Sequence, residues 1–139
     1  MTRPDFQHGL VGGIDRFNRL EFWEAHEAWE ELWLQAQSDV HQFLQGLIQV
    51  AAAYHHVKRG TFPGAVRLFE AGLKKLQPFP PLYCGIDRDA LVTAARQHQR
   101  WTAQQMKTEH RAERLRSDEF PRIVLVPDWT SRVPTGDQW

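Results

Sequence analysis

The segment FWEAHEAWEELW, residues 22–33, is the stretch that most directly predicts the fold. Acidic residues near its start favour a helix, which we place at about residues 21–37. Side chains four or seven residues apart share a helix face, so His26 and Glu30 fall among the large aromatic residues. Those residues are Phe22, Trp23, Trp29 and Trp33. We therefore expect a buried aromatic face with a histidine–glutamate pair in its middle.

Apolar residues at helical spacing predict further helices on both sides of this one. Including the segment above, we expect helices at about residues 14–20, 21–37, 40–59, 62–76 and 88–115. The fourth has an inner face formed by Val66, Phe69, Leu73 and Leu76. The second half of the last helix is mostly polar and is expected to pack only at its edge.

Residues typical of helix ends support these boundaries. Ser38 or Asp39 is expected to cap the third helix, and Gly60 to end it after two cations. Thr61 is expected to cap the fourth helix and Asp87 the last one.

The chain changes character after Ser117. The segment FPRIVLVPDW, residues 120–129, has two prolines around a short extended run, and no partner strand is evident elsewhere. We therefore expect an arm that lies across the helical body. The predicted fold is all-α: one helical domain over residues 1–139, a compact bundle or irregular array of about five helices (1–116) with a short extended C-terminal arm (117–139).

Composition narrows the range of functions. Lysine plus arginine equals aspartate plus glutamate, 17 against 17, so no overall charge favours nucleic acid or an anionic membrane. No apolar run approaches the ~20 residues needed to cross a bilayer. The single cysteine, Cys84, fits a reducing compartment, and we expect a cytoplasmic protein. Cys84 has no adjacent base and is not expected to act as a nucleophile.

A second polar stripe follows in the third predicted helix. Its members step by four and three residues and are bordered by apolar side chains: Gln45, Gln49, Ala52, His56 and Arg59. A stripe enclosed in this way is expected to face another helix rather than water. We predict that His26 and Glu30 meet Gln45, Gln49 and His56 in a sealed polar network. The candidate site is therefore His26, Glu27, Glu30, Gln45, Gln49, His56 and Arg59.

The string HEAWE differs from the zinc-protease motif H-E-x-x-H at the position that matters. The second histidine is replaced by Glu30, so that motif is absent. No cofactor is predicted, but a divalent metal at His26, Glu30 and His56 stays open as an alternative, as does acid–base chemistry by the same residues. The GLVGG segment, residues 9–13, follows no predicted strand and does not indicate a phosphate-binding loop.

Three segments carry a family resemblance: FNRLEFWEAHEAWEELW (17–33), FLQGLIQVAAAYHHVKRGTFPGA (43–65) and LYCGID (82–87). Over about residues 14–87 the chain resembles the domain of unknown function 309 family. The resemblance implies a compact array of α-helices and no particular activity, substrate or cofactor. Leu20 stands where the family often has glycine, which predicts a less sharp turn there.

Two classes of function follow from these observations. The first, which we favour, is a non-enzymatic module that binds a protein partner or a second copy through the last helix and the tail residues Trp129 and Trp139. The second is a small metal-binding protein or acid–base enzyme that uses His26, Glu30 and His56. The first class allows the polar network to be sealed, whereas the second requires it to open to solvent.

Overall fold

A computed structural model of the chain describes residues 4–107, 113–136 and 139. These residues form five α-helices, a short hairpin and two 3-10 turns. The helices are α1 (Phe6–Asn18), α2 (Phe22–Trp33), α3 (Ser38–Arg59), α4 (Phe62–Leu76) and α5 (Arg88–Gln105). The hairpin consists of β1 (Leu82–Tyr83) and β2 (Ile86–Asp87), and the 3-10 turns are η1 (Ser117–Glu119) and η2 (Trp129–Ser131). The predicted all-α class is confirmed.

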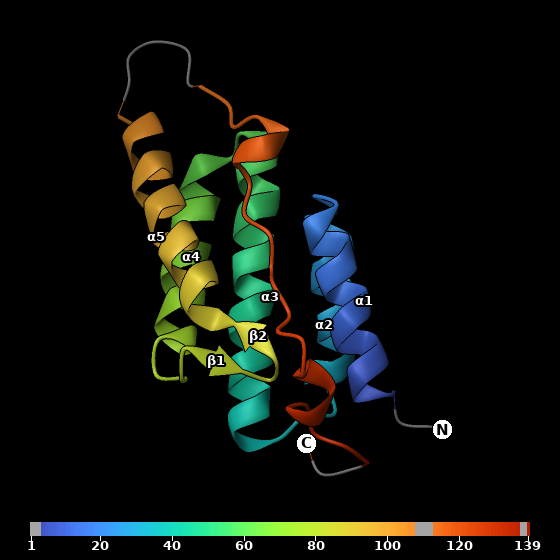
Figure 1. Cartoon of the computed structure of the whole chain (residues 1–139). Coiled ribbons are helices and arrows are strands. Elements are labelled where there is room, and N and C mark those ends of the chain that lie inside the picture. The colour runs from blue at the N-terminus through green and yellow to red at the C-terminus, as the bar shows by residue number, and fades with distance from the viewer. Residues whose placement is uncertain (1–3, 108–112, 137–138) are drawn as a thin grey trace.

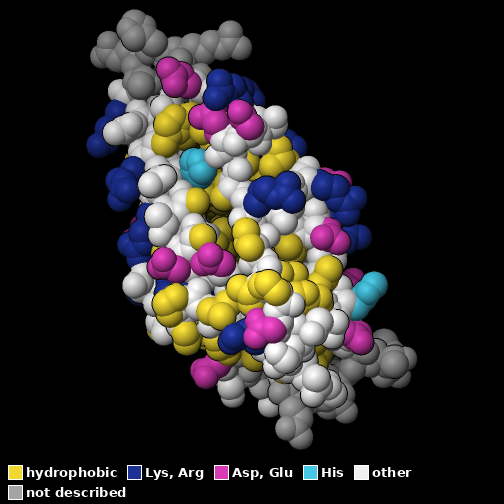
Figure 2. Space-filling view, viewed as in Figure 1, with side chains coloured by type: hydrophobic (Ala, Val, Ile, Leu, Met, Phe, Trp, Pro, Cys, Tyr) yellow, Lys and Arg dark blue, Asp and Glu magenta, His cyan; other side chains and the backbone are white. Residues whose placement is uncertain are grey.

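Helix α3 stands in the middle of the molecule (Figure 1). It packs against α2 on one side and α4 on the other, while α1 covers α2 and α5 covers α4. The C-terminal arm runs along α3 towards the hairpin. On the face drawn in Figure 2, Lys and Arg side chains line the edge formed by α5. No helix among the described residues is both long and apolar enough to span a bilayer.

Helix α1 begins eight residues earlier than predicted, at Phe6 instead of residue 14. Asp5 caps it by accepting a hydrogen bond from the backbone N–H of His8 at 3.0 Å. The GLVGG segment therefore lies inside a helix. Because glycine has no apolar side chain, these residues interrupt the hydrophobic pattern from which a helix is predicted. Leu20 adopts a φ of 65°, so the turn into α2 keeps the left-handed geometry without a glycine.

Close packing of α1 on α2 explains two of these glycines. A Cβ atom at Gly13 would lie 2.0 Å from Nε1 of Trp29, and one at Gly9 would lie 2.7 Å from Cδ2 of Leu32. The indole of Trp29 is fully buried, and its N–H donates to the backbone carbonyl of Leu10 at 3.2 Å. The backbone of α1 thus forms a notch that is filled by the tryptophan.

The buried face of α2 differs from the predicted one. Its buried residues are Phe22, Ala25, Trp29 and Leu32. Trp23 is 45 % exposed and Trp33 half-buried. The prediction was wrong because the buried face was inferred mainly from the positions of the three tryptophans. The actual face is set by the packing of α2 between α1 and α3, which places Ala25 in the interior.

The helix ends follow the prediction in part. Gly60 ends α3 with a φ of 77°, and the Asp87 carboxylate caps α5 by accepting from Ala90 N–H at 3.0 Å. The predicted caps of α3 are wrong, since Ser38 is already helical and the N-cap residue is Gln37. Thr61 occupies the N-cap position of α4 without a side-chain capping bond.

Helix α5 ends at Gln105 rather than near residue 115. Residues 108–112 of the predicted helix lie outside the described part of the chain, and residues 113–116 are not helical.

The arm pairs with the hairpin, which the sequence did not predict. The backbone N–H of Asp87 donates to Val124 O at 3.0 Å, and that of Val126 donates to Gly85 O at 2.9 Å. The side-chain amide of Asn18 completes the attachment, because it donates to Ile123 O at 3.0 Å and accepts from Ile123 N–H at 2.7 Å. Strands of two residues are too short to show an alternating pattern, which explains the missed partner.

The tail tryptophans anchor this arm. Trp139 is 5 % exposed and packs on Phe6 with ring centroids 5.0 Å apart. Trp129 lies against Gly85, where a Cβ atom would come within 2.4 Å of the tryptophan Cβ. Trp139 is therefore buried in the fold, whereas Trp129 is half-buried.

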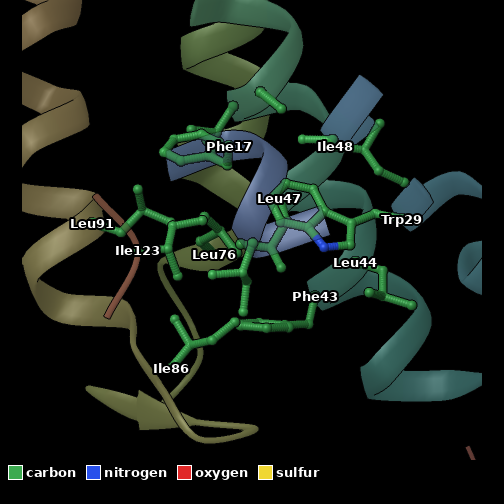
Figure 3. Close-up of a cluster of buried hydrophobic side chains, with 14 of the residues drawn as sticks. Phe17, Trp29, Phe43, Leu44, Leu47, Ile48, Leu76, Ile86, Leu91 and Ile123 are labelled. Atoms are coloured by element: carbon green, nitrogen blue, oxygen red, sulfur yellow. The ribbon is translucent and has the colours of Figure 1, made fainter. Parts of the chain in front are cut away.

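Side chains from all five helices meet in the core, as Figure 3 shows. Phe17 comes from α1, Trp29 from α2, Leu47 from α3, Leu76 from α4 and Leu91 from α5. Ile86 of the hairpin and Ile123 of the arm belong to the same cluster, with Ile123 beside Leu91. The arm is therefore part of the core rather than an appendage.

Gly13→Ala is expected to lower the free energy of unfolding by about 2 kcal/mol, because overpacking against Trp29 and loss of its hydrogen bond outweigh the gain in helix propensity. Gly12→Ala is the matched control. Its Cβ would meet only the flexible end of Arg16, at 3.2 Å, so this variant is expected to be unchanged or more stable by up to about 1 kcal/mol. Urea denaturation measures both, and equal effects would contradict the notch.

Candidate functional site

The His26–Glu30 pair lies at the surface of α2. Nε2 of His26 is 3.1 Å from Oε2 of Glu30, one helical turn away. The side chains are 17 % and 47 % exposed. The prediction of a sealed pair in the middle of a buried face is therefore wrong, because the inward direction of α2 is occupied by Ala25 and Trp29.

Trp23 joins this pair to a second histidine. Its ring centroid lies 4.6 Å from that of His26 and 5.1 Å from that of His55 on α3. Burial lowers the pKa of His55, and the neighbouring His56 and Arg59 lower it further. An exposed tryptophan is thus held between a partly buried imidazole of its own helix and one of the next helix.

His55 was not among the predicted site residues. A signal was available, since Leu44, Ile48 and Ala51 form the apolar row of α3 that borders the polar stripe, and His55 is the next position in that row. The row meets α2, so its last member reaches Trp23.

The other end of α2 repeats the pairing of tryptophan with histidine. Trp33 stacks on His41 of α3 with centroids 4.7 Å apart and planes inclined by 23°. Two buried ring nitrogens of α2, Nδ1 of His26 and Nε1 of Trp33, have no hydrogen-bond partner among the described residues.

The predicted partners of His26 and Glu30 lie elsewhere. Gln49 accepts from Nζ of Lys75 on α4 at 2.9 Å, and Nδ1 of His56 lies 2.6 Å from Oγ1 of Thr61 at the end of α3. Their contacts therefore place these two residues on the α4 side of α3, away from His26. The central helix α3 has neighbouring helices on two sides, α2 and α4. The sequence alone did not show which of them the polar stripe faces.

Among the described residues, no hydrogen bond or ion pair joins the other three members of the candidate site to His26 or Glu30. Gln45 is half-buried on α3, and Arg59 is exposed. Glu27 lines a pocket of about 370 Å³ between α1 and α2, together with Glu24, Glu31 and Arg16. Within the predicted set, the described contacts join His26 directly to Glu30.

Metal ligation by this set has limited geometric support. His26 and Glu30 supply two neighbouring ligands, whereas His56 contacts Thr61. Within residues 4–107, 113–136 and 139, no three or more His, Cys, Asp or Glu side chains are grouped so that they could hold a metal ion.

A partly buried polar contact between helices does exist, and it joins residues that were not in the candidate set. The hydroxyl of Tyr54 on α3 lies 2.7 Å from Nδ1 of His98 on α5. Tyr54 is fully buried, and burial raises its pKa well above the usual value. Burial also lowers the pKa of His98, which the backbone and carboxylate of Glu119 only partly offset. The neutral imidazole is therefore favoured, and it links α3 to α5 beside the start of the arm.

Cys84 is unsuited to nucleophilic chemistry, as expected. It is 7 % exposed, and burial raises the pKa of its thiol to about 12. The thiolate is therefore scarce at neutral pH.

Comparison with known proteins supports the resemblance over part of the chain. Residues 10–68 match a family described as "Domain of unknown function (DUF309)". The match contains α2 and α3 and every member of the predicted site. The hairpin segment LYCGID and the arm lie beyond it, so the resemblance ends earlier than the predicted residue 87. No curated protein matches the chain.

The Tyr54–His98 contact predicts a pH dependence of stability. Because folding lowers the pKa of His98, its contribution to stability is present above the unfolded pKa of about 6.5 and is lost as pH falls through the folded value. We expect the wild-type protein to lose stability on acidification more steeply than His98→Gln. Urea denaturation over this pH range measures both slopes, and parallel slopes would contradict the assignment.

Cys84 is expected to resist thiol reagents such as Ellman's reagent while the protein is folded, because the sulfur is buried and protonated. The same thiol should react at once in denaturant. Rapid labelling of the native protein would show that the hairpin opens readily.

Proposed function

We propose that the protein is a non-enzymatic interaction module whose partner protein binds the outer face of α2. The observation that carries the proposal is Trp23, which is 45 % exposed and packed against His26 and His55. Tryptophan is strongly enriched among the residues that dominate binding energy in interfaces.

Leu34 is a second exposed anchor on the same side of the helix. It follows α2 directly and is 66 % exposed. Trp23 and Leu34 are eleven positions apart, about three helical turns, so they lie in line about 16 Å from each other. Glu27 and Glu30 lie between them in the same line. We call Trp23, Glu27, Glu30 and Leu34 the docking face.

The docking face is held in place before any partner arrives. Trp23 is supported by two rings, and α2 is fixed between α1 and α3 by the notch at Gly13. A preorganised anchor loses little side-chain entropy on binding, which favours affinity.

The enzyme alternative receives less support from the geometry. Catalysis by His26 and Glu30 requires a site that holds a substrate against them. The pocket between α1 and α2, and another of about 570 Å³ between the hairpin and the arm, are lined by other residues. His26 and Glu30 line neither of these pockets, which fits a position at the edge of a contact surface better than a catalytic site. We place the module in the cytoplasm, since the free Cys84 is compatible with a reducing compartment.

Photo-crosslinking in the native cells tests this proposal. A photoreactive amino acid replaces Glu31, an exposed position beside the docking face, and in a control protein it replaces the exposed Thr93 of α5. We expect a discrete adduct from position 31 and none from position 93. Adding Trp23→Ala should weaken the adduct about tenfold or more, because truncating a central anchor removes much of the binding energy.

Circular dichroism checks that the Trp23→Ala protein is folded. An adduct that survives the loss of Trp23, or equal adducts from both positions, would contradict docking through this face.

A further inference from the structure

We propose that the segment bound by the docking face is a basic amphipathic helix, with two apolar residues three turns apart and lysine or arginine between them. The inference rests on the proposed function, and it specifies the chemistry of the partner.

Charge complementarity is the first reason. Helix α2 contains four glutamates and neither lysine nor arginine. Within the described part of the chain, Glu30 is paired with His26, whereas Glu24, Glu27 and Glu31 have no ion-pair partner. The nearby Arg16 directs its guanidinium to the backbone carbonyl of Gly12 instead. A chain with balanced charges thus leaves this helix acidic and open to a cationic partner.

The spacing of the anchors is the second reason. Trp23, Glu27, Glu30 and Leu34 follow one another at steps of four, three and four. The same steps place apolar, cationic, cationic and apolar side chains in one line on a partner helix. Helices packed nearly parallel or antiparallel keep such lines in register over about three turns. An extended peptide, with its period of two, would not match these positions.

A second copy of the chain fits the face poorly. If two copies of α2 met antiparallel, with Trp23 against Leu34, each Glu27 would lie opposite Glu30 of the other copy. Like charges that face each other disfavour the contact, whereas lysine or arginine at those positions favours it.

Three helical peptides of identical length test the inference with the full chain. Each has leucine at the first and twelfth positions of the docking line, and the two positions between carry lysine, glutamine or glutamate. Fluorescence anisotropy is expected to show the lysine peptide binding about tenfold or more tightly than either of the others. Trp23→Ala should weaken this binding by a similar factor.

Charge reversal supplies the decisive comparison. The double variant Glu27→Lys/Glu30→Lys should prefer the glutamate peptide, and Glu27→Gln/Glu30→Gln should lose the preference while keeping the helical circular dichroism of the wild type. Equal binding of all three peptides, or a preference that the double variant leaves unchanged, would overturn the inference. So would a dimer in sedimentation that dissociates on Trp23→Ala, because the face would then belong to a second copy.

The two proposals fail in different ways. If an adduct forms at position 31 but the lysine peptide is not preferred, only the inference that the partner segment is a basic helix is overturned. Absence of the Trp23-dependent adduct overturns the docking function itself.

Discussion

The close approach of α1 and α2 at Gly13 and Trp29 is the contact on which the rest of the molecule depends. The absence of a side chain at Gly13 lets the indole sit against the backbone of α1 and donate to Leu10. With Trp29 fixed there, Ala25 points inward and Trp23 points out. The contact between Gly13 and Trp29 on the inner side of α2 therefore fixes the rotation of the helix, and with it the residues that form the docking face on the outer side.

The outline of the fold could be predicted, because its signals are local. Gly60 and Asp87 act at helix ends as expected. Three of the four predicted inner residues of α4 are buried, namely Phe69, Leu73 and Leu76, whereas Val66 is only half-buried. The orientation of α2 could not be predicted in the same way. Glycine contributes nothing to a hydrophobic pattern, so the packing role of Gly9 and Gly13 could not be predicted from it. The positions of the three tryptophans then placed the centre of the predicted buried face at the wrong residues.

The candidate site was predicted only in part, for a related reason. His26 and Glu30 are one turn apart on one helix, and the structure joins them as helical geometry requires. Contacts between helices depend on rotation and on which neighbour lies on which flank, and spacing alone does not give these. Gln49 therefore pairs with Lys75 of α4, and a partly buried contact between helices forms between Tyr54 and His98 rather than around His26.

The attachment of Ile123 to the side chain of Asn18 has a consequence for how the molecule opens. Its two hydrogen bonds join residues 105 positions apart, so they close a loop that contains most of the chain. The entropy of closing so long a loop is offset only while the apolar side chains of the arm remain buried with it. Residues near the two ends of the chain are therefore joined directly, and a fluctuation that lifts Ile123 away from α1 breaks both of its hydrogen bonds to Asn18 together.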